Sequence, residues 1–317
     1  MVIKLSLDSG RFATKRAYYH PTNRGLIKHS IPTLFTEIDY NELTGSSFRV
    51  EYKGHLYAVG GNLPYELIEE NSKLVFSHEL CIYTSVAQMI IESGLNLDEI
   101  HEIDLSINLP LNDFKNNKAA YEDKYQTNEL IEMSVNNKEV KFIITRLRCY
   151  YEGMGTLIRH EKYRKGLVGV VDIGGKNETI IFYENFKAIR GMNMAGHEGS
   201  LVLFEAVARD LSTQYETDFT IQQVEMMARG ELDAIDGFQE SLDHHGLALA
   251  KLIRNKVISF KQNRALARYV FTGGGSFVFK PYLEEVFSEY QIEFINDAQY
   301  DNVVGALIRM WRERDKA

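Results

Sequence analysis

Residues 168–175, Val-Gly-Val-Val-Asp-Ile-Gly-Gly, carry the strongest structural signal in this chain of 317 residues. A near-continuous apolar run of this kind predicts a strand that is buried on both faces. The strand ends in Asp172, and two glycines follow. A carboxylate at the end of a buried strand is costly unless it is paired, hydrogen-bonded or near a metal. The stretch therefore predicts a ligand site at the end of a central strand.

A second stretch, at the N-terminus, has the same pattern of a strand that ends in an aspartate and is followed by glycine. Residues 2–7 alternate between apolar and polar side chains, which predicts a strand, and residues 8–10, Asp-Ser-Gly, follow as a turn. A glycine in such a turn lets the backbone approach a phosphate. Lys15 comes seven residues after Asp8, on the expected return strand, so its ammonium group can point at the same phosphate.

The third stretch, residues 272–276, Thr-Gly-Gly-Gly-Ser, lies between an expected strand and an expected helix. Three consecutive glycines are costly in conformational entropy, so they indicate a backbone that lies against a ligand, with a flexible loop as the alternative. Two common nucleotide motifs are excluded. No Gly-Lys-Ser/Thr follows the glycines, as a Walker A motif would require, and the G-x-G-x-x-G pattern of dinucleotide folds is missing.

Composition narrows the class of protein. The chain has 36 Lys plus Arg against 44 Asp plus Glu, a net charge of −8, which argues against a surface that mainly neutralises nucleic-acid phosphates. Cys81 and Cys149 are too few for a zinc cluster and are expected to be buried thiols in a reducing cytoplasm. The N-terminus passes directly into a strand, so no signal peptide is expected, and no apolar window is long enough for a transmembrane helix.

The order of elements indicates an internal repeat. Each half of the chain shows a strand, a glycine turn, further strands and then a helix, and the two turns begin at Asp8 and Asp172. Helices are expected at residues 77–93, 198–211, 221–229, 242–260, 280–290 and 301–314. A length of 317 residues is consistent with two domains at about 150 residues per domain.

In this order, the motifs resemble those of the superfamily that comprises actin, the sugar kinases and the seventy-kilodalton heat-shock chaperones. Residues 8–15 resemble its first phosphate motif, residues 172–175 its second, and residues 272–276 its adenosine motif. Residues 152–156, Glu-Gly-Met-Gly-Thr, and 301–306, Asp-Asn-Val-Val-Gly-Ala, resemble its two connecting segments. The resemblance thus extends over nearly the whole chain.

The resemblance implies an α/β, actin-like fold, in which two related domains, each a mixed sheet flanked by helices, close over a nucleotide cleft. Domain I would comprise residues 1–152 and 297–317, and domain II residues 153–296. The implied cofactors are ATP or GTP together with Mg²⁺.

The same resemblance implies the site residues. Asp8 and Asp172 would hold the metal through water, and Glu152 would orient or deprotonate the attacking water. The implied nucleotide contacts come from the three glycine-rich segments, namely Ser9, Gly10, Lys15, Gly174, Gly175, Lys176, Asn177, Gly273, Gly274, Gly275 and Ser276. The sequence departs from the family pattern at Asn177, where threonine is usual, and at Thr179, where an acidic residue is frequent.

Within the superfamily, the short chain, the Glu of the first connecting segment and residues 190–196, Arg-Gly-Met-Asn-Met-Ala-Gly, resemble ParM and related plasmid-segregation actins. That resemblance implies an ATPase that polymerises into filaments and that a small DNA-binding adaptor links to a centromere-like site. Direct contact with DNA or with a membrane is not expected. The alternatives are a sugar or acid kinase of the same superfamily and a cell-shape or division actin with an amphipathic terminal helix.

Overall fold

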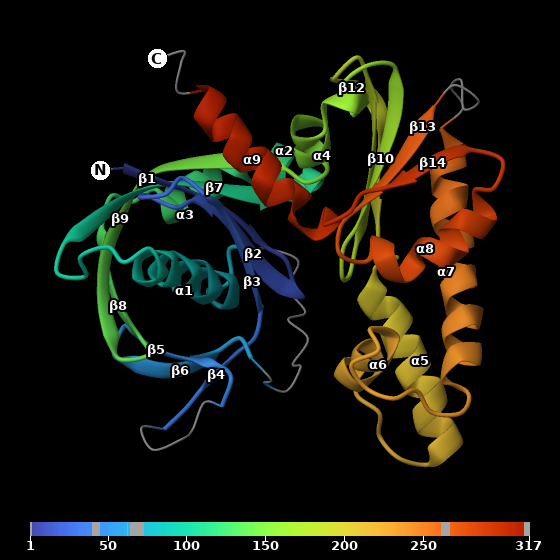
Figure 1. Ribbon diagram of the computed structural model, residues 1–317, viewed down its shortest axis with the longest axis horizontal. Coiled ribbons are helices and arrows are strands. Elements are labelled where there is room, and N and C mark those ends of the chain that lie inside the picture. Colours follow the sequence, from blue (N-terminus) through green and yellow to red (C-terminus); the bar gives the residue numbers. More distant parts are fainter. Residues whose placement is uncertain (1, 40–44, 62, 64–72, 261–266, 314–317) are drawn as a thin grey trace. The chain divides into compact units, whose positions relative to one another are not determined.

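The structure is a computed structural model, and it describes residues 2–39, 45–61, 63, 73–260 and 267–313 (Figure 1). It divides into two compact units. Unit 1 comprises Met1–Arg159 and Asn302–Ala317, and unit 2 comprises His160–Asp301.

Unit 1 contains a mixed sheet with the strand order β3-β2-β1-β7-β9-β8-β5-β6-β4. The strands are β1 (Val2–Ser9), β2 (Ala13–Tyr19), β3 (Leu26–Pro32), β4 (Phe35–Glu37), β5 (Phe48–Tyr52), β6 (His55–Val59), β7 (Ile100–Leu109), β8 (Leu130–Val135) and β9 (Lys138–Tyr151). Its helices are α1 (Phe76–Glu92), α2 (Leu111–Asn116), α3 (Lys118–Tyr125), α4 (Met154–Arg159) and nearly all of α9 (Asp301–Arg312).

Helix α1 lies inside the curve of this sheet (Figure 1). It is buried almost all round its circumference, since the sheet wraps it. The alternation at the N-terminus places Ile3, Leu5 and Leu7 of β1 in the same core as Leu80 and Val86 of α1. The predicted strand and the predicted helix are therefore both confirmed, and their packing fixes where β1 ends.

Unit 2 contains a smaller sheet with the order β12-β11-β10-β13-β14. The strands are β10 (Leu167–Ile173), β11 (Glu178–Glu184), β12 (Lys187–Gly196), β13 (Arg268–Thr272) and β14 (Gln291–Phe294). Helices α5 (Ser200–Tyr215), α6 (Ile221–Ala228), α7 (Phe238–Ser259) and α8 (Ser276–Val286) share a core with this sheet. β10 is central, as its apolar run predicts, because β11 pairs with it antiparallel and β13 parallel.

The predicted repeat is present in the strand register. β1 and β2 pair Asp8 with Lys15, and β10 and β11 pair Asp172 with Thr179. One offset relates both positions, since 172 − 8 and 179 − 15 both equal 164. The two halves therefore carry the same hairpin at equivalent positions.

Some expected elements differ from the structure. The expected helices do not include α2, α3 and α4, and β9 continues to Tyr151, past the mostly apolar residues 140–144. Its continuation was hidden because Arg148 interrupts the apolar pattern, while in the fold this arginine pairs with Asp104 of β7. The helix expected at residues 280–290 begins earlier, at Ser276, because the Ser276 hydroxyl donates to the Gly273 carbonyl at 2.7 Å and the helix follows the glycines directly.

Two further observations bear on the class of protein. Cys81 and Cys149 are both buried and free, as expected. Within the described part of the chain, every helix is too short or too polar to cross a membrane.

Candidate functional site

The first glycine turn joins β1 to β2. Gly10 N–H donates to the Ala13 carbonyl at 3.1 Å, which closes the turn. Asp8 and Lys15 lie directly opposite each other on the two strands, so their side chains share one face of the sheet. The predicted approach of Lys15 to Asp8 is therefore a consequence of the hairpin register.

A residue that the sequence motifs missed, Lys73, lies at this turn. Its ammonium nitrogen is 3.0 Å from Asp8 Oδ1, 3.0 Å from Glu152 Oε1 and 2.6 Å from the Asn108 carbonyl oxygen. The side chain is only 7% exposed. Lys73 thus joins two of the predicted catalytic carboxylates within unit 1, and all three of its N–H groups have acceptors.

The backbone of Lys73 is held as firmly as its side chain. Its N–H donates to the Tyr121 hydroxyl at 3.0 Å, and its carbonyl accepts from the Tyr125 hydroxyl at 2.9 Å. Both tyrosines belong to α3 and are almost fully buried. The position of Lys73 is therefore built into the fold of unit 1.

The charges in this cluster stabilise one another. Burial alone would raise the pKa of the Asp8 carboxyl, but the ammonium groups of Lys73 and Lys15 outweigh burial and hold that pKa below its usual value. Burial would likewise lower the pKa of Lys73, yet Asp8 and Glu152 raise it above its usual value. The Asp8 carboxylate and the Lys73 ammonium group are therefore both ionised near neutral pH.

The second glycine turn joins β10 to β11 and has the same geometry as the first. Gly174 N–H donates to the Asn177 carbonyl at 2.8 Å. A Cβ atom built on Gly10 or on Gly174 would lie 3.2 Å from the carbonyl that closes its own turn. The two predicted phosphate turns are thus the same structural device.

Backbone groups support the second turn. Ser200 and Leu201, at the start of α5, donate their N–H groups to the carbonyls of Gly174 and Gly175 at 3.1 and 2.7 Å. A Cβ on Gly199 would lie 2.2 Å from the Gly175 carbonyl oxygen. Only a glycine at position 199 therefore lets the start of α5 lie against the turn.

The three-glycine segment packs against the same turn. β10 and β13 run parallel and pair Asp172 with Thr272, so both residues stand at the carboxyl ends of neighbouring strands. At Gly273, which has φ of +85°, a Cβ would lie 2.3 Å from Asp172 Oδ1. At Gly275 it would lie 2.8 Å from the Gly174 carbonyl oxygen. Two of the three glycines are therefore needed for packing within unit 2.

The middle glycine differs from its neighbours. A Cβ on Gly274 would meet only the Gln299 Cβ, at 3.8 Å, which is ordinary contact. Close packing does not explain this glycine, so it is the member of the segment that suits the approach of a ligand. Ser276, by contrast, uses its hydroxyl hydrogen in bonding the Gly273 carbonyl.

A second lysine cluster, centred on the half-buried Lys256, lies at the start of β11. Lys256 of α7 contacts both Glu178, at 2.5 Å, and Glu198. Glu198 N–H also donates to Glu178 Oε2 at 2.7 Å. Glu178 is fully buried and immediately follows Asn177, so its contacts with Lys256 and Glu198 hold the end of the second turn in place. Asn177 itself lies 3.4 Å from His197 Nδ1 through its side-chain oxygen.

The two predicted connecting segments meet in unit 1. Gly153 N–H donates to Asn302 Oδ1 at 2.9 Å. A Cβ on Gly305, in the middle of α9, would lie 2.3 Å from the Gly155 Cα. Glycine within a helix costs about 0.5–1 kcal/mol relative to alanine. Here the close crossing of α4 and α9 requires it.

The carboxylates suit a magnesium ion held through water. In the described residues, three or more His, Cys, Asp or Glu side chains never gather as a metal cage would need. Mg²⁺ usually keeps several waters and uses one or two carboxylates with substrate phosphates. Within its own unit, each of the buried carboxylates Asp8 and Asp172 has the donor chemistry that such an ion uses.

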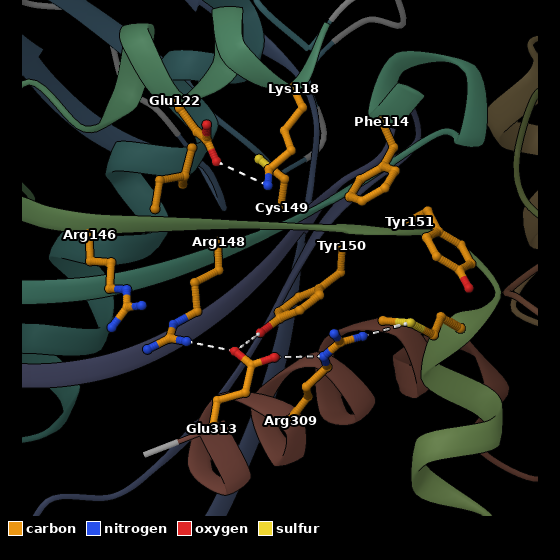
Figure 2. Close-up of a pocket in the computed structure, with 12 residues that line it drawn as sticks. Phe114, Lys118, Glu122, Arg146, Arg148, Cys149, Tyr150, Tyr151, Arg309 and Glu313 are labelled. Atoms are coloured by element: carbon orange, nitrogen blue, oxygen red, sulfur yellow. Dashed lines mark hydrogen bonds and ion pairs between the residues drawn. The ribbon is translucent and has the colours of Figure 1, made fainter. Parts of the chain in front are cut away.

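A separate concavity of about 330 Å³ lies beside the last residues of β9 (Figure 2). The Glu313 carboxylate lies 2.7 Å from Arg148 Nη1, 2.8 Å from Arg309 Nε and 3.2 Å from the Tyr150 hydroxyl. Figure 2 shows these four side chains turned toward one another. Arg148 also binds both carboxylate oxygens of Asp104, at 2.9 and 3.0 Å. Met154 of the first connecting segment lines this concavity, but none of the predicted site residues does, so it is distinct from the candidate site.

A carboxylate-glycine turn in each of two units, with glycine-packed connecting segments, is the arrangement that the resemblance to actin and the sugar kinases leads us to expect. The chain has an actin-like fold, and its residues 6–155 are similar to the family described as the actin-like proteins N-terminal domain. No curated protein matches the sequence.

Solved structures confirm the fold over the whole chain. A non-polymerisable quadruple mutant of pCBH ParM is similar with a TM-score of 0.79 and 14% identity, over 98% of this chain and 100% of that chain. ParM of Bacillus thuringiensis with ATP gives 0.70 and 13%, over 99% of both chains. The filament of AlfA from the B. subtilis plasmid pLS32 gives 0.67 and 18%, over 97% and 98%. The predicted actin-like fold is confirmed, and it is that of the ParM-type structures.

Proposed function

We propose that this protein is an ATPase that binds Mg·ATP, or Mg·GTP, and polymerises in response to it, for the segregation of plasmid DNA. The observation that carries the proposal is the pair of equivalent turns, each with a carboxylate at the end of a buried strand. A similar ParM structure contains ATP, and a similar AlfA structure is a filament. Domain I would comprise residues 1–152 and 297–317, and domain II residues 153–296.

In this proposal each unit contributes its turn to one nucleotide. The N–H groups of Gly10 and Gly174 already close the turns, so these glycines serve by letting a phosphate come close to the backbone. The amides that follow them, at Arg11 and Gly175, would donate to phosphate oxygens. Lys15 would supply a positive charge opposite Asp8.

The remaining predicted contacts would complete the site. Ser9, Lys176 and Asn177 belong to the two turns, and residues 273–276 would lie along the adenosine. Asp8 and Asp172 would hold Mg²⁺ through water, and the ion would neutralise phosphate charge. Glycine at position 274 would leave room for the nucleotide.

Glu152 is the proposed catalytic carboxylate for hydrolysis. Lys73 holds its Oε1 at 3.0 Å, which fixes the carboxylate that would orient the attacking water. Positioning of a nucleophile by a side chain contributes about 10²–10⁴ in rate. Glu152→Gln should therefore bind ATP normally and release phosphate about 10²–10⁴ times more slowly. An unchanged rate would move this role to another residue.

Assembly is proposed to need no partner other than further copies of this chain. A small DNA-binding adaptor would link the filament to DNA in the cytoplasm, without membrane contact. The net charge of −8 is consistent with a filament that does not bind DNA directly.

Light scattering with ATP, compared with ADP, tests this function. A filament protein should scatter light above a critical concentration with ATP alone. A small-molecule kinase should instead remain a fixed oligomer and hydrolyse ATP faster when a sugar or acid is added. Flat scattering together with sugar-dependent hydrolysis would contradict the proposal.

A further inference from the structure

A chain of buried hydrogen bonds runs from α1 to the first turn. His78 Nδ1 lies 2.8 Å from Ser9 Oγ. Ser9 Oγ lies 2.9 Å from Thr14 Oγ1, which lies 3.0 Å from Thr33 Oγ1. Thr33 Oγ1 lies 2.6 Å from the carbonyl oxygen of Gly10. The four side chains are at most 1% exposed, so the chain is closed off from bulk water.

The direction of every hydrogen in this chain follows from its last member. A carbonyl oxygen only accepts, so the single Thr33 hydroxyl hydrogen points to Gly10. Thr14 must then donate to Thr33, since Thr33 has no hydrogen left.

The same reasoning continues to the histidine. Because the Thr14 hydrogen points to Thr33, Ser9 must donate to Thr14. With the hydrogen of Ser9 used in this way, His78 Nδ1 must carry a proton and donate it to Ser9 Oγ. The tautomer of His78 is therefore set by the Gly10 carbonyl, which is four hydrogen bonds away.

From this geometry we propose that His78 is a positioning residue of the first phosphate turn, acting as an Nδ1–H donor at the head of a one-way chain of hydroxyls. The proposal deepens the nucleotide function proposed above and rests on it for its role in binding. His78 does not itself contact the nucleotide.

The chain would position the turn in two ways. By holding the Gly10 carbonyl towards Thr33, it fixes the peptide between Gly10 and Arg11. The N–H of Arg11 then points away from Thr33, since carbonyl and N–H are opposed in a trans peptide. The chain also directs the Ser9 hydroxyl hydrogen to Thr14. Ser9 therefore meets a phosphate through its backbone and not as a hydroxyl donor.

The surroundings keep the imidazole neutral. Burial, together with the positive charges of Lys73 and Arg11, lowers the pKa of His78 to about 3. A neutral ring with Nδ1 protonated has an unprotonated Nε2. In His78, Nδ1 is therefore expected to carry the proton and Nε2 to carry none.

Nitrogen-15 NMR of the histidine rings in the nucleotide-free protein at pH 7 tests the inference directly. The signals of His78 are assigned by their loss in His78→Asn. The expected result is a neutral ring with a protonated Nδ1 and an unprotonated Nε2. A ring protonated at Nε2 alone would overturn the proposal, and the tautomer itself is read from the wild-type protein.

A matched pair of variants tests the direction of the hydrogen bonds in this chain of hydroxyl groups. Thr14→Val removes the acceptor of the Ser9 hydrogen, so Ser9 can donate to Nδ1 and the ring should change to the Nε2–H form, alone or in a mixture. Thr84→Val is the control, because the buried hydroxyl of Thr84, on the same helix, has no hydrogen-bond partner among the described residues. It should leave the tautomer unchanged. An unchanged tautomer in Thr14→Val would contradict the one-way chain.

Calorimetric titration with Mg·ATP tests the role in binding. His78→Leu should weaken binding about tenfold, the equivalent of one well-formed hydrogen bond. His78→Asn, whose amide nitrogen is bonded to Cγ as Nδ1 is, should retain affinity within about threefold. Equal losses in both variants would show that the ring only fills space. If the wild type bound no ATP, the proposed function would fail while the tautomer result still decided the hydrogen-bond chain.

Discussion

The two glycine turns have the same backbone and opposite kinds of support. In unit 1, side chains hold the turn, through the hydroxyl chain from His78 and the ammonium group of Lys73. In unit 2, main-chain groups do most of this, through the start of α5 and the backbone at Gly273 and Gly275. A repeated hairpin thus keeps its geometry while its surroundings diverge.

The divergence is visible at one equivalent position. The offset of 164 residues relates Thr14 to Glu178, since 178 − 14 equals 164. Thr14 is a link in the hydroxyl chain, whereas Glu178 joins Lys256 and Glu198. Unit 1 should therefore be sensitive to the loss of polar side chains, and unit 2 to the addition of a Cβ to its glycines.

The largest effect is expected for Lys73→Met. This change leaves the carboxylates of Asp8 and Glu152 close together without their buried counter-charge. Removing one partner of a buried ion pair costs about 3–5 kcal/mol in the free energy of unfolding. Urea unfolding measures the loss.

Lys53→Met is the control for this substitution. Lys53 also pairs with a carboxylate, that of Glu79, but its side chain is 64% exposed. An exposed pair contributes at most about 1 kcal/mol. Similar losses of unfolding free energy in Lys73→Met and Lys53→Met would show that burial does not make the Lys73 ion pairs more stabilising than an exposed pair.

Gly273→Ala should have the next largest effect. Its φ of +85° is unfavourable for alanine, and the new Cβ would lie 2.3 Å from Asp172 Oδ1. Backbone strain and overpacking together should lower the free energy of unfolding by about 2–4 kcal/mol. In Gly191→Ala, with φ of +78° and no atom within 4 Å of the Cβ, only the strain of about 1–2 kcal/mol remains. Equal losses of unfolding free energy in Gly273→Ala and Gly191→Ala would show that the close packing around Gly273 does not contribute to stability.

A pH dependence should follow from His78. Its pKa is lowered from 6.5 to about 3, by burial first and then by Lys73, Arg11 and Lys124 against the opposing charge of Asp8. Between pH 6.5 and about 3, His78 therefore binds a proton in the unfolded chain but not in the folded protein. The contribution of His78 to stability is full above pH 6.5 and is lost as the pH falls towards 3.

The variant His78→Asn removes this titration. Between about pH 6 and 4, the wild type should lose up to about 1.4 kcal/mol per pH unit more than this variant. Unfolding by urea at a series of pH values measures both slopes. Parallel slopes would mean that the imidazole is not held neutral.

The smallest effect tests the equivalence of the turns. A Cβ at Gly10 or at Gly174 would lie 3.2 Å from the closing carbonyl in each turn, and neither glycine has positive φ. Both alanine variants should therefore lose about 1 kcal/mol or less, and by the same amount within about 0.5 kcal/mol. A clear difference in the measured unfolding free energies would show that the two turns are not the same device.

The sequence predicts those parts of the site that are close together along the chain. Asp8, Gly10 and Lys15 belong to one hairpin, so spacing and alternation place them correctly. The same holds for Asp172 and the glycines that follow it. Burial of β10 and the order of the five motifs are enough to predict the fold.

Lys73 and His78 could not be found in this way. Both lie near the start of α1, more than 60 residues after the turn they support, since 73 − 8 is 65 and 78 − 9 is 69. They reach it because α1 packs beneath β1, and their partners are set by tertiary structure. A buried lysine or histidine has no local pattern that separates it from an exposed one.

Calorimetric titration of Mg·ATP into the wild type, Asp8→Asn and Asp172→Asn tests the central claim, that both turns bind one nucleotide. One Mg·ATP should bind per chain. Each variant should bind it at least about tenfold more weakly, a loss of about 1.4 kcal/mol, because each would remove one carboxylate from the proposed Mg²⁺ site. Wild-type affinity in either variant would contradict the claim.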